Sequence, residues 1–86
     1  MAKQVKMMVL EGCPHCAHAF ELMKELKLEN PQYADIDVEI IDERRDEGKI
    51  QGYDFWYVPA FFVNGVEIFE GVPTKNKIED VFMRAI

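Results

Sequence analysis

The segment Val58–Gly71, with the sequence VPAFFVNGVEIFEG, constrains the fold more than any other part of the chain. It contains two apolar runs, Ala60–Val63 and Val66–Phe69, joined by the pair Asn64-Gly65. An Asn-Gly pair between two such runs favours a type I′ turn, because that turn needs positive φ at both central positions. The sequence therefore predicts a tight hairpin of two neighbouring antiparallel strands.

The first third of the chain predicts a strand followed by a helix. Val5–Leu10 is a short apolar run typical of a buried strand, and a Glu-Gly pair ends it. Pro14 suits the first turn of a helix, where its missing N–H costs no hydrogen bond, and Pro31 predicts the end of that helix near Asn30. Between the prolines, apolar residues recur at the three- and four-residue spacing of an amphipathic helix; they are Cys16, Phe20, Met23 and Leu26.

Three further elements complete the expected fold. Ile36–Asp42 alternates apolar and acidic residues, which predicts an edge strand with one solvent-facing side. The charged segment Glu43–Tyr53 predicts a short exposed helix that ends near Gly52. Thr74–Ile86 predicts a C-terminal helix, and its apolar face consists of Ile78, Val81, Phe82 and Ala85.

These elements predict an α/β fold in the order β-α-β-α-β-β-α, with a four-stranded mixed sheet flanked by helices. A chain of 86 residues with 49% hydrophobic content suits a single domain over residues 1–86. Short parallel strands joined through a helix need right-handed crossovers, so few topologies remain.

Charge and hydropathy exclude several classes of function. The net charge of −6 argues against nucleic-acid binding and against an anionic membrane surface, since both need a basic face. The apolar runs fall far short of the roughly 20 residues that span a bilayer. The N-terminal run is also shorter than the ~7–15 apolar residues of a secretory signal. We therefore expect a cytoplasmic protein, and a monomer.

The two cysteines, Cys13 and Cys16, lie where the first strand leads into the first helix. At a helix N-terminus, unpaired backbone N–H groups and the positive end of the dipole favour a thiolate. Cys13 is therefore the predicted nucleophile, and Cys16, one turn further in, is predicted to resolve a mixed disulfide. Pro14 fixes the first turn, and His15 is placed to tune the neighbouring thiolate.

Metal chemistry is the alternative for the same residues. A structural zinc site needs four ligands, whereas CPHCAH offers Cys13, Cys16 and one of His15 or His18, with no second cluster in the chain. Covalent haem needs C-x-x-C-H, and His18 comes one residue too late. We interpret His18 as a solvent-facing helix residue. A metal or iron–sulfur carrier that shares the cysteines across a dimer stays open.

In this order of elements, with CPHC before the first helix and Val58-Pro59 before the hairpin, the chain resembles the thioredoxin superfold and, within it, the glutaredoxin branch. The resemblance implies a thiol-disulfide oxidoreductase with a redox-active Cys13–Cys16 disulfide and no bound cofactor. It also implies a cis peptide before Pro59, opposite the cysteines, and a Val58 backbone that pairs with an extended substrate. Of the four aromatic residues in Tyr53–Tyr57, at least two are expected in the core, and Tyr57 is the best candidate to line the substrate groove.

Departures from both branches bear on the electron donor. Glutaredoxins that use glutathione carry a basic residue before the first cysteine and a Gly-Gly pair after the hairpin, where this chain has Glu11 and Phe69-Glu70. Thioredoxins carry a buried aspartate and a tryptophan at the positions of Met7 and Gly12. Glutathione is anionic, so Glu11 repels it. The expected partners are disulfide-containing proteins or small molecules, with a flavoprotein reductase favoured over glutathione as the donor.

Overall fold

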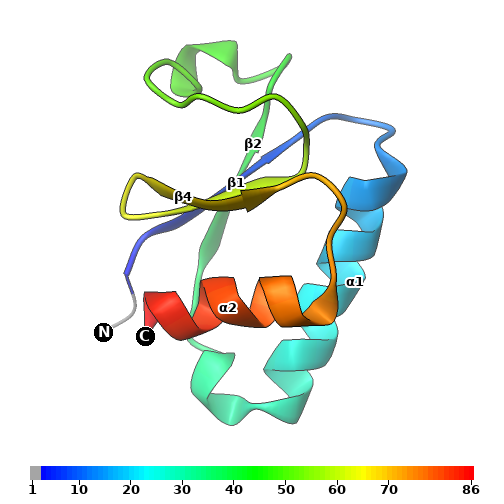
Figure 1. The fold of residues 1–86 in the computed structure, drawn as a ribbon, viewed down its shortest axis with the longest axis vertical. Helices are drawn as coiled ribbons and strands as arrows, with labels where there is room; N and C mark the ends of the chain where they lie inside the picture. Colours follow the sequence, from blue (N-terminus) through cyan, green and yellow to red (C-terminus); the bar gives the residue numbers. More distant parts are fainter. Residues whose placement is uncertain (1–2) are drawn as a thin grey trace.

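The computed structural model describes residues 3–86 and forms one four-stranded sheet with two α-helices (Figure 1). Met1 and Ala2, which the predicted domain includes, lie outside the described residues. The elements follow one another as β1 (Val5–Val9), α1 (Pro14–Glu29), β2 (Val38–Asp42), β3 (Ala60–Val63), β4 (Val66–Glu70) and α2 (Lys75–Ala85). No helix of the described chain is long and apolar enough to cross a membrane.

The sheet is mixed, as the sequence predicted, and its strand order is β2-β1-β3-β4. β1 pairs in parallel with β2, from Val5 opposite Val38 to Val9 opposite Asp42. β3 pairs antiparallel with both β1 and β4. The predicted edge position of β2 is confirmed. The hairpin turn is also confirmed, since Asn64 and Gly65 have φ values of 49° and 82°.

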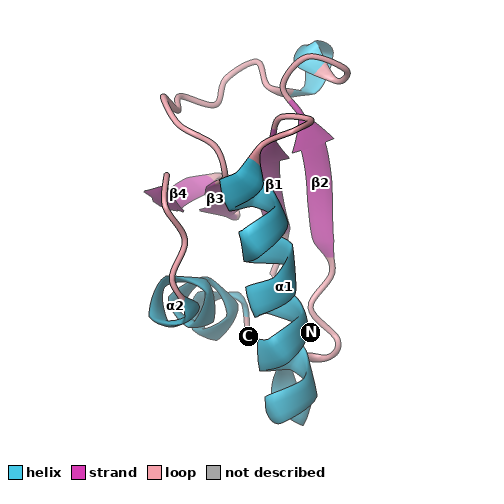
Figure 2. Cartoon of the chain, turned by 90° about the vertical axis from the view of Figure 1, so that its right-hand side faces the viewer, coloured by secondary structure: helices cyan, strands magenta, loops and turns pink. Residues whose placement is uncertain are grey.

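Both α-helices pack against the same face of the sheet (Figure 2). The predicted apolar face of α2 is confirmed, because Ile78, Val81, Phe82 and Ala85 are buried. On α1 the buried residues are Cys16, Ala19, Leu22, Met23 and Leu26. The prediction that Phe20 belongs to the buried face of this helix was wrong, since the residue is 39% exposed. The sheet packs against a side of the helix that is centred on Ala19 and Met23.

The other face of the sheet is covered by the segment between β2 and β3, and here the predicted exposed helix was wrong. The segment forms turns and a single 3₁₀ turn, Glu47–Lys49. The Asp42 carboxylate accepts hydrogen bonds from the N–H groups of Arg44 and Arg45 at 2.9 and 3.0 Å. Such side-chain bonds compete with the first turn of a helix. Ile50, Tyr53 and Phe55 from this segment pack on Met8, Ile41, Ala60 and Phe62.

Candidate functional site

Cys13 occupies the N-cap of α1, with extended backbone angles and Pro14 in the first turn after it. Its Sγ accepts a hydrogen bond from the backbone N–H of Cys16 at 3.2 Å. The loop before it is closed by the Cys13 N–H, which donates to the Leu10 carbonyl at 3.1 Å. An N–H that points at a sulfur stabilises negative charge there, in addition to the effect of the helix dipole.

Cys16 lies in a different environment, although it is one turn away. Its side chain belongs to the core and is only 3% exposed, whereas Cys13 is half-buried. Burial is the main cause, and the neighbouring Cys13 thiol the second, that raises the pKa of the Cys16 thiol to about 12. Cys16 is thus protonated at neutral pH. Both cysteines are free thiols, so the structure describes the reduced protein.

Val58 and Pro59 form the wall opposite Cys13. The peptide bond between them is cis, as predicted, and the Cys13 thiol donates to the Val58 carbonyl across 3.8 Å. Pro59 is buried directly before β3, and its carbonyl accepts the Gly71 N–H at 2.9 Å. The fold therefore brings Cys13, Cys16, Val58 and Pro59 together from two distant parts of the chain.

The aromatic residues before Val58 divide into two groups. Tyr53 and Phe55 are half-buried and meet the Phe62 ring edge-on, with centroids 4.9 and 6.4 Å away. Tyr53 and Phe55 thus pack against the core without being fully buried, so the expectation of at least two core aromatics holds only in part. Trp56 and Tyr57 are 89% and 68% exposed. The predicted substrate contact of Tyr57 stays a prediction.

The two histidines do not join the cysteines in a metal-binding cluster. His15 and His18 are both exposed on α1, and the solvent-facing position expected for His18 is confirmed. Within residues 3–86, no group of three or more His, Cys, Asp or Glu side chains is arranged to hold a metal ion. A carrier function would therefore need ligands from a second molecule.

A cavity of about 290 Å³ lies beside the cysteines, between α1 and the ends of β1 and β2. Both cysteines line it, and so do two residues that sequence reasoning missed, Asp42 and Arg45. A signal for Asp42 was present: it ends a strand predicted to run parallel to the strand before Cys13, and such ends meet at one edge of a sheet. Most other lining side chains are apolar: Val9, Leu10, Ala17, Phe20 and Ile40.

Asp42 connects the cysteine loop to the segment after β2. It is 8% exposed, and its carboxylate accepts the Glu11 N–H at 3.1 Å in addition to those of Arg44 and Arg45. These backbone donors hold the pKa of Asp42 below its usual range, and the N–H of Arg45 has the largest effect. Asp42 is therefore ionised at neutral pH. Because it bonds both segments, it fixes the loop that presents Cys13.

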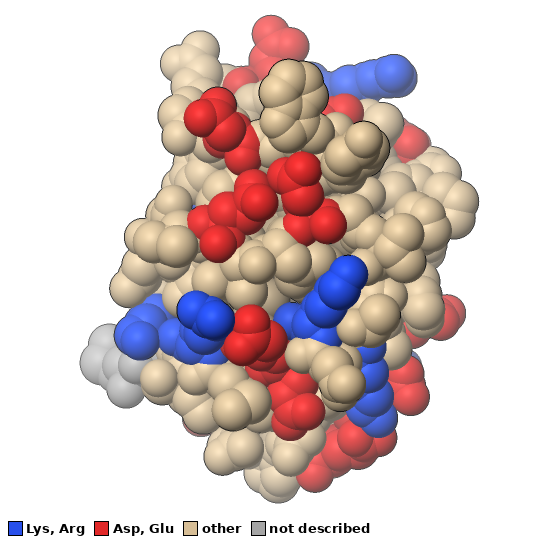
Figure 3. Space-filling model, viewed as in Figure 1, with Lys and Arg blue, Asp and Glu red and all other residues tan. Residues whose placement is uncertain are grey.

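Acidic side chains also gather over β4, near the segment that carries Trp56 (Figure 3). The Glu70 carboxylate accepts the Trp56 N–H, with both oxygens 3.2 Å from the nitrogen. Desolvation and then the nearby Glu70 carboxylate raise the pKa of Glu67 above its usual value. The surface over β4, next to the segment that carries Trp56, is thus rich in carboxyl groups.

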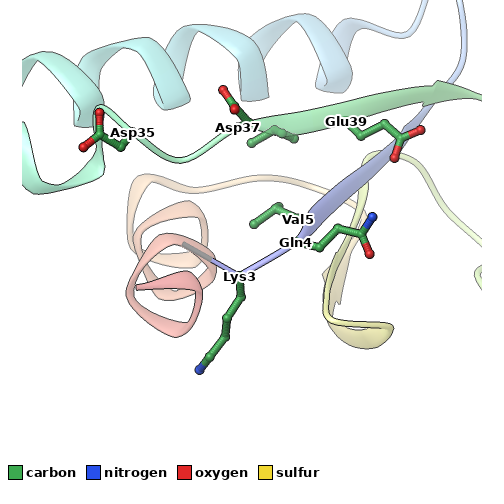
Figure 4. A pocket seen from close by; sticks show the side chains of 7 residues that line it. Lys3, Gln4, Val5, Asp35, Asp37 and Glu39 are labelled. Carbon is green, nitrogen blue, oxygen red and sulfur yellow. The ribbon is translucent and has the colours of Figure 1, made fainter. Parts of the chain in front are cut away.

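A second, larger cavity of about 620 Å³ lies around the starts of β1 and β2 (Figure 4). Asp35, Asp37 and Glu39 line it from one strand and the segment before it, and Lys3 and Gln4 line it from the other. It contains neither cysteine. The larger cavity is therefore not the one that the two thiols line.

Comparison with known proteins identifies relatives over nearly the whole chain. Residues 3–83 match the family model described as "Thioredoxin domain". A "Probable Thioredoxin" of Methanothermobacter thermautotrophicus is 35% identical over 79 residues, which cover 91% of this chain and 89% of that protein. A "Thioredoxin" of Methanocaldococcus jannaschii is 30% identical over 74 residues, which cover 86% of this chain and 85% of that protein.

Among solved structures, the zinc-bound form of human ERp44 superposes with a TM-score of 0.60 at 16% identity. The match covers 94% of this chain and 25% of that one, so this chain spans a quarter of the length of ERp44. At this identity the likeness concerns the fold alone.

Proposed function

We propose that this chain, which belongs to the thioredoxin family, is a dithiol thiol-disulfide oxidoreductase with Cys13 as the nucleophile and Cys16 as the resolving thiol. The predicted thioredoxin superfamily is confirmed, whereas the glutaredoxin branch within it stays a prediction. The observation that carries this proposal is the contrast between the two thiols. Cys13 is half-buried and its sulfur accepts a helix N–H, whereas Cys16 is buried and protonated at neutral pH. One thiol is therefore suited to begin the reaction and the other to finish it.

In the first step, the Cys13 thiolate attacks one sulfur of a substrate disulfide. The substrate S–S bond breaks, and its second sulfur leaves as a thiolate that takes a proton from water. Cys16 then gives its proton to water and attacks the Cys13 sulfur, which releases the other half of the substrate as a thiol. Two electrons have passed to the substrate, and Cys13 and Cys16 are joined in a disulfide.

The Val58 carbonyl supports an extended substrate segment at this site. It lies 3.8 Å from the Cys13 sulfur, so a chain paired with the Val58 backbone would place its own disulfide next to Cys13. The exposed Tyr57 precedes Val58 and is available to contact the same segment. We propose disulfide-containing proteins and small disulfides as the substrates.

The proposed electron donor is a flavoprotein reductase rather than glutathione, and the proposed setting is a monomer in the cytoplasm. Glu11, beside the cysteines, disfavours an anionic tripeptide. Phe69 and Glu70 occupy the place where glutathione-using relatives carry a glycine pair. Sedimentation of the reduced protein tests the monomer directly.

Coupled turnover assays test the function and the donor separately. We expect wild-type protein to reduce a protein disulfide with a thioredoxin reductase and NADPH, and to work far more slowly with glutathione and glutathione reductase. Cys13→Ser should abolish turnover with either system. Efficient turnover with glutathione alone would reject the proposed donor, and full activity of Cys13→Ser would reject the function itself.

The alternative function is a metal or iron–sulfur carrier. Two free thiols on one helical turn, one of them half-exposed, could supply two ligands to a site shared by two chains. The metal content of the purified protein distinguishes this function from the redox function.

A further inference from the structure

The cavity beside the cysteines has an ion pair among the side chains that line it. The Glu11 carboxylate accepts a hydrogen bond from the Arg45 guanidinium at 3.3 Å, and both side chains are largely exposed. The backbone N–H of Glu11 also bonds Asp42. Arg45 and Asp42 flank the same hollow, in which apolar side chains surround the cysteines. A small molecule that reaches the sulfurs through this cavity thus passes the ion pair.

The charges around this cavity do not balance. Of the side chains that line it, Arg45 is the one cation, whereas Glu11 and Asp42 are both carboxylates. Arg45 lies 3.3 Å from the first carboxylate and 4.0 Å from the second. The positive charge of Arg45 is already balanced by these carboxylates. An incoming anion would therefore have to displace Glu11 from Arg45, and it would enter a cavity whose lining carries a net negative charge.

We propose that this cavity is the access site for small, neutral and largely apolar thiols and disulfides, and that Glu11 determines its specificity by occupying Arg45 and so disfavouring anionic ones. The inference rests on the proposed redox function, and adds to it the class of small molecule that reaches the cysteines. The volume of about 290 Å³ suits a small thiol or a single side chain.

The reaction that reports this specificity is the reduction of the Cys13–Cys16 disulfide by a small thiol. A thiolate attacks the Cys13 sulfur, the protein S–S bond breaks, and Cys16 leaves as a thiolate that takes a proton. A second thiolate then attacks the mixed disulfide and releases Cys13. The small thiol is oxidised to its disulfide, and the protein gains two electrons.

The experiment uses oxidised full-length protein and three probes: mercaptoacetate (anionic), 2-mercaptoethanol (neutral) and cysteamine (cationic). The rate for each variant is divided by the wild-type rate with the same probe, which cancels the intrinsic reactivity of that probe. Glu11→Gln should raise the mercaptoacetate rate by about two- to five-fold, as expected for one exposed charge pair. The 2-mercaptoethanol rate should change little, and the cysteamine rate should fall.

Asp80→Asn is the matched control. Asp80 is paired with Arg84 at 3.1 Å on α2, away from the start of α1, and its loss changes the net charge as Glu11→Gln does (Figure 1). It should leave all three rate ratios near one. An equal effect of Asp80→Asn, or an equal effect of Glu11→Gln on all three probes, would overturn the proposal.

Arg45→Gln tests the role of the cation. When Arg45 is already replaced, Glu11→Gln should raise the mercaptoacetate rate by a smaller factor, because there is no guanidinium that loss of Glu11 could make available to the anion. An undiminished gain would reject Arg45 as the group that the anion engages. If a thioredoxin reductase reduces the oxidised wild-type protein but 2-mercaptoethanol does not, the access proposal fails and the redox function stands. If neither reduces it, the proposed redox function itself fails.

Discussion

The backbone nitrogen of Cys16 lies 3.2 Å from the Sγ of Cys13, so the residue that carries the buried thiol also donates a hydrogen bond to the half-buried one. The two thiols are therefore coupled through the first turn of α1, but they differ in access to solvent and in protonation.

This difference predicts an order of alkylation. At neutral pH, iodoacetamide should modify Cys13 rapidly and Cys16 very slowly, because burial raises the pKa of Cys16 to about 12. In Cys13→Ser, modification of Cys16 should stay slow up to strongly alkaline pH. Mass spectrometry after timed quenching gives both rates, and equal rates would contradict the assignment of roles.

The reaction order predicts that one variant traps its substrate. Cys16→Ser should accumulate a mixed disulfide between Cys13 and a substrate protein, since no thiol is left to resolve it. Cys13→Ser should trap none, because the remaining thiol is 3% exposed. Non-reducing gels measure the adduct. Equal trapping by the two variants would contradict the assigned roles, and trapping by Cys13→Ser alone would exchange them.

Asp42 is predicted to matter for acid stability. Its pKa is lowered in the folded protein by the backbone donors of Arg45 and Arg44, so its contribution is present above the usual aspartate pKa and is lost as the pH falls through the lowered value. Asp42→Asn should lower the melting temperature at pH 7 by several degrees and flatten the acid limb of the stability profile. Thermal unfolding from pH 7 to pH 2 measures both, and Asp46→Asn, at the neighbouring carboxylate, is the comparison. An unchanged acid limb would contradict the assignment.

Two tyrosines in one segment should behave differently on truncation. Tyr53→Ala should cost about 1–3 kcal/mol of stability, because this ring packs on Phe62 and lies under the Lys6 ammonium. Tyr57→Ala should leave the unfolding midpoint unchanged and raise KM for a protein disulfide. Urea titration and steady-state kinetics separate the effects, and an unaltered KM would remove Tyr57 from the site.

Metal analysis tests the carrier function. Protein purified without oxygen should contain far less than one iron or zinc per chain and should be colourless, since the described residues gather no third ligand beside the cysteines. Stoichiometric metal that is lost in Cys13→Ser would support the carrier instead. Elemental analysis and visible absorption provide the measurement.

Local signals in the sequence determined much of this fold. Asn64 and Gly65 specify their turn through backbone conformations that few other residues adopt. Pro14 favours the first turn of α1, because its fixed φ suits a helix and its missing N–H costs no hydrogen bond there. The apolar face of α2 was predicted because a regular spacing of three and four residues leaves one side to bury. The pair Cys13 and Cys16 was also evident from the sequence, because both cysteines stand in one short motif.

Only the tertiary structure decided how α1 is rotated on the sheet, which left Phe20 exposed at the cavity instead of in the core. It also decided the segment after β2, where Asp42 binds the backbone that a helix would have used. The contact between Asp42 and Glu11 joins residues 31 positions apart, and it exists because β1 and β2 run parallel and end at the same edge. The sequence alone therefore identified the thiols, whereas pairing between distant strands placed the charged residues around them.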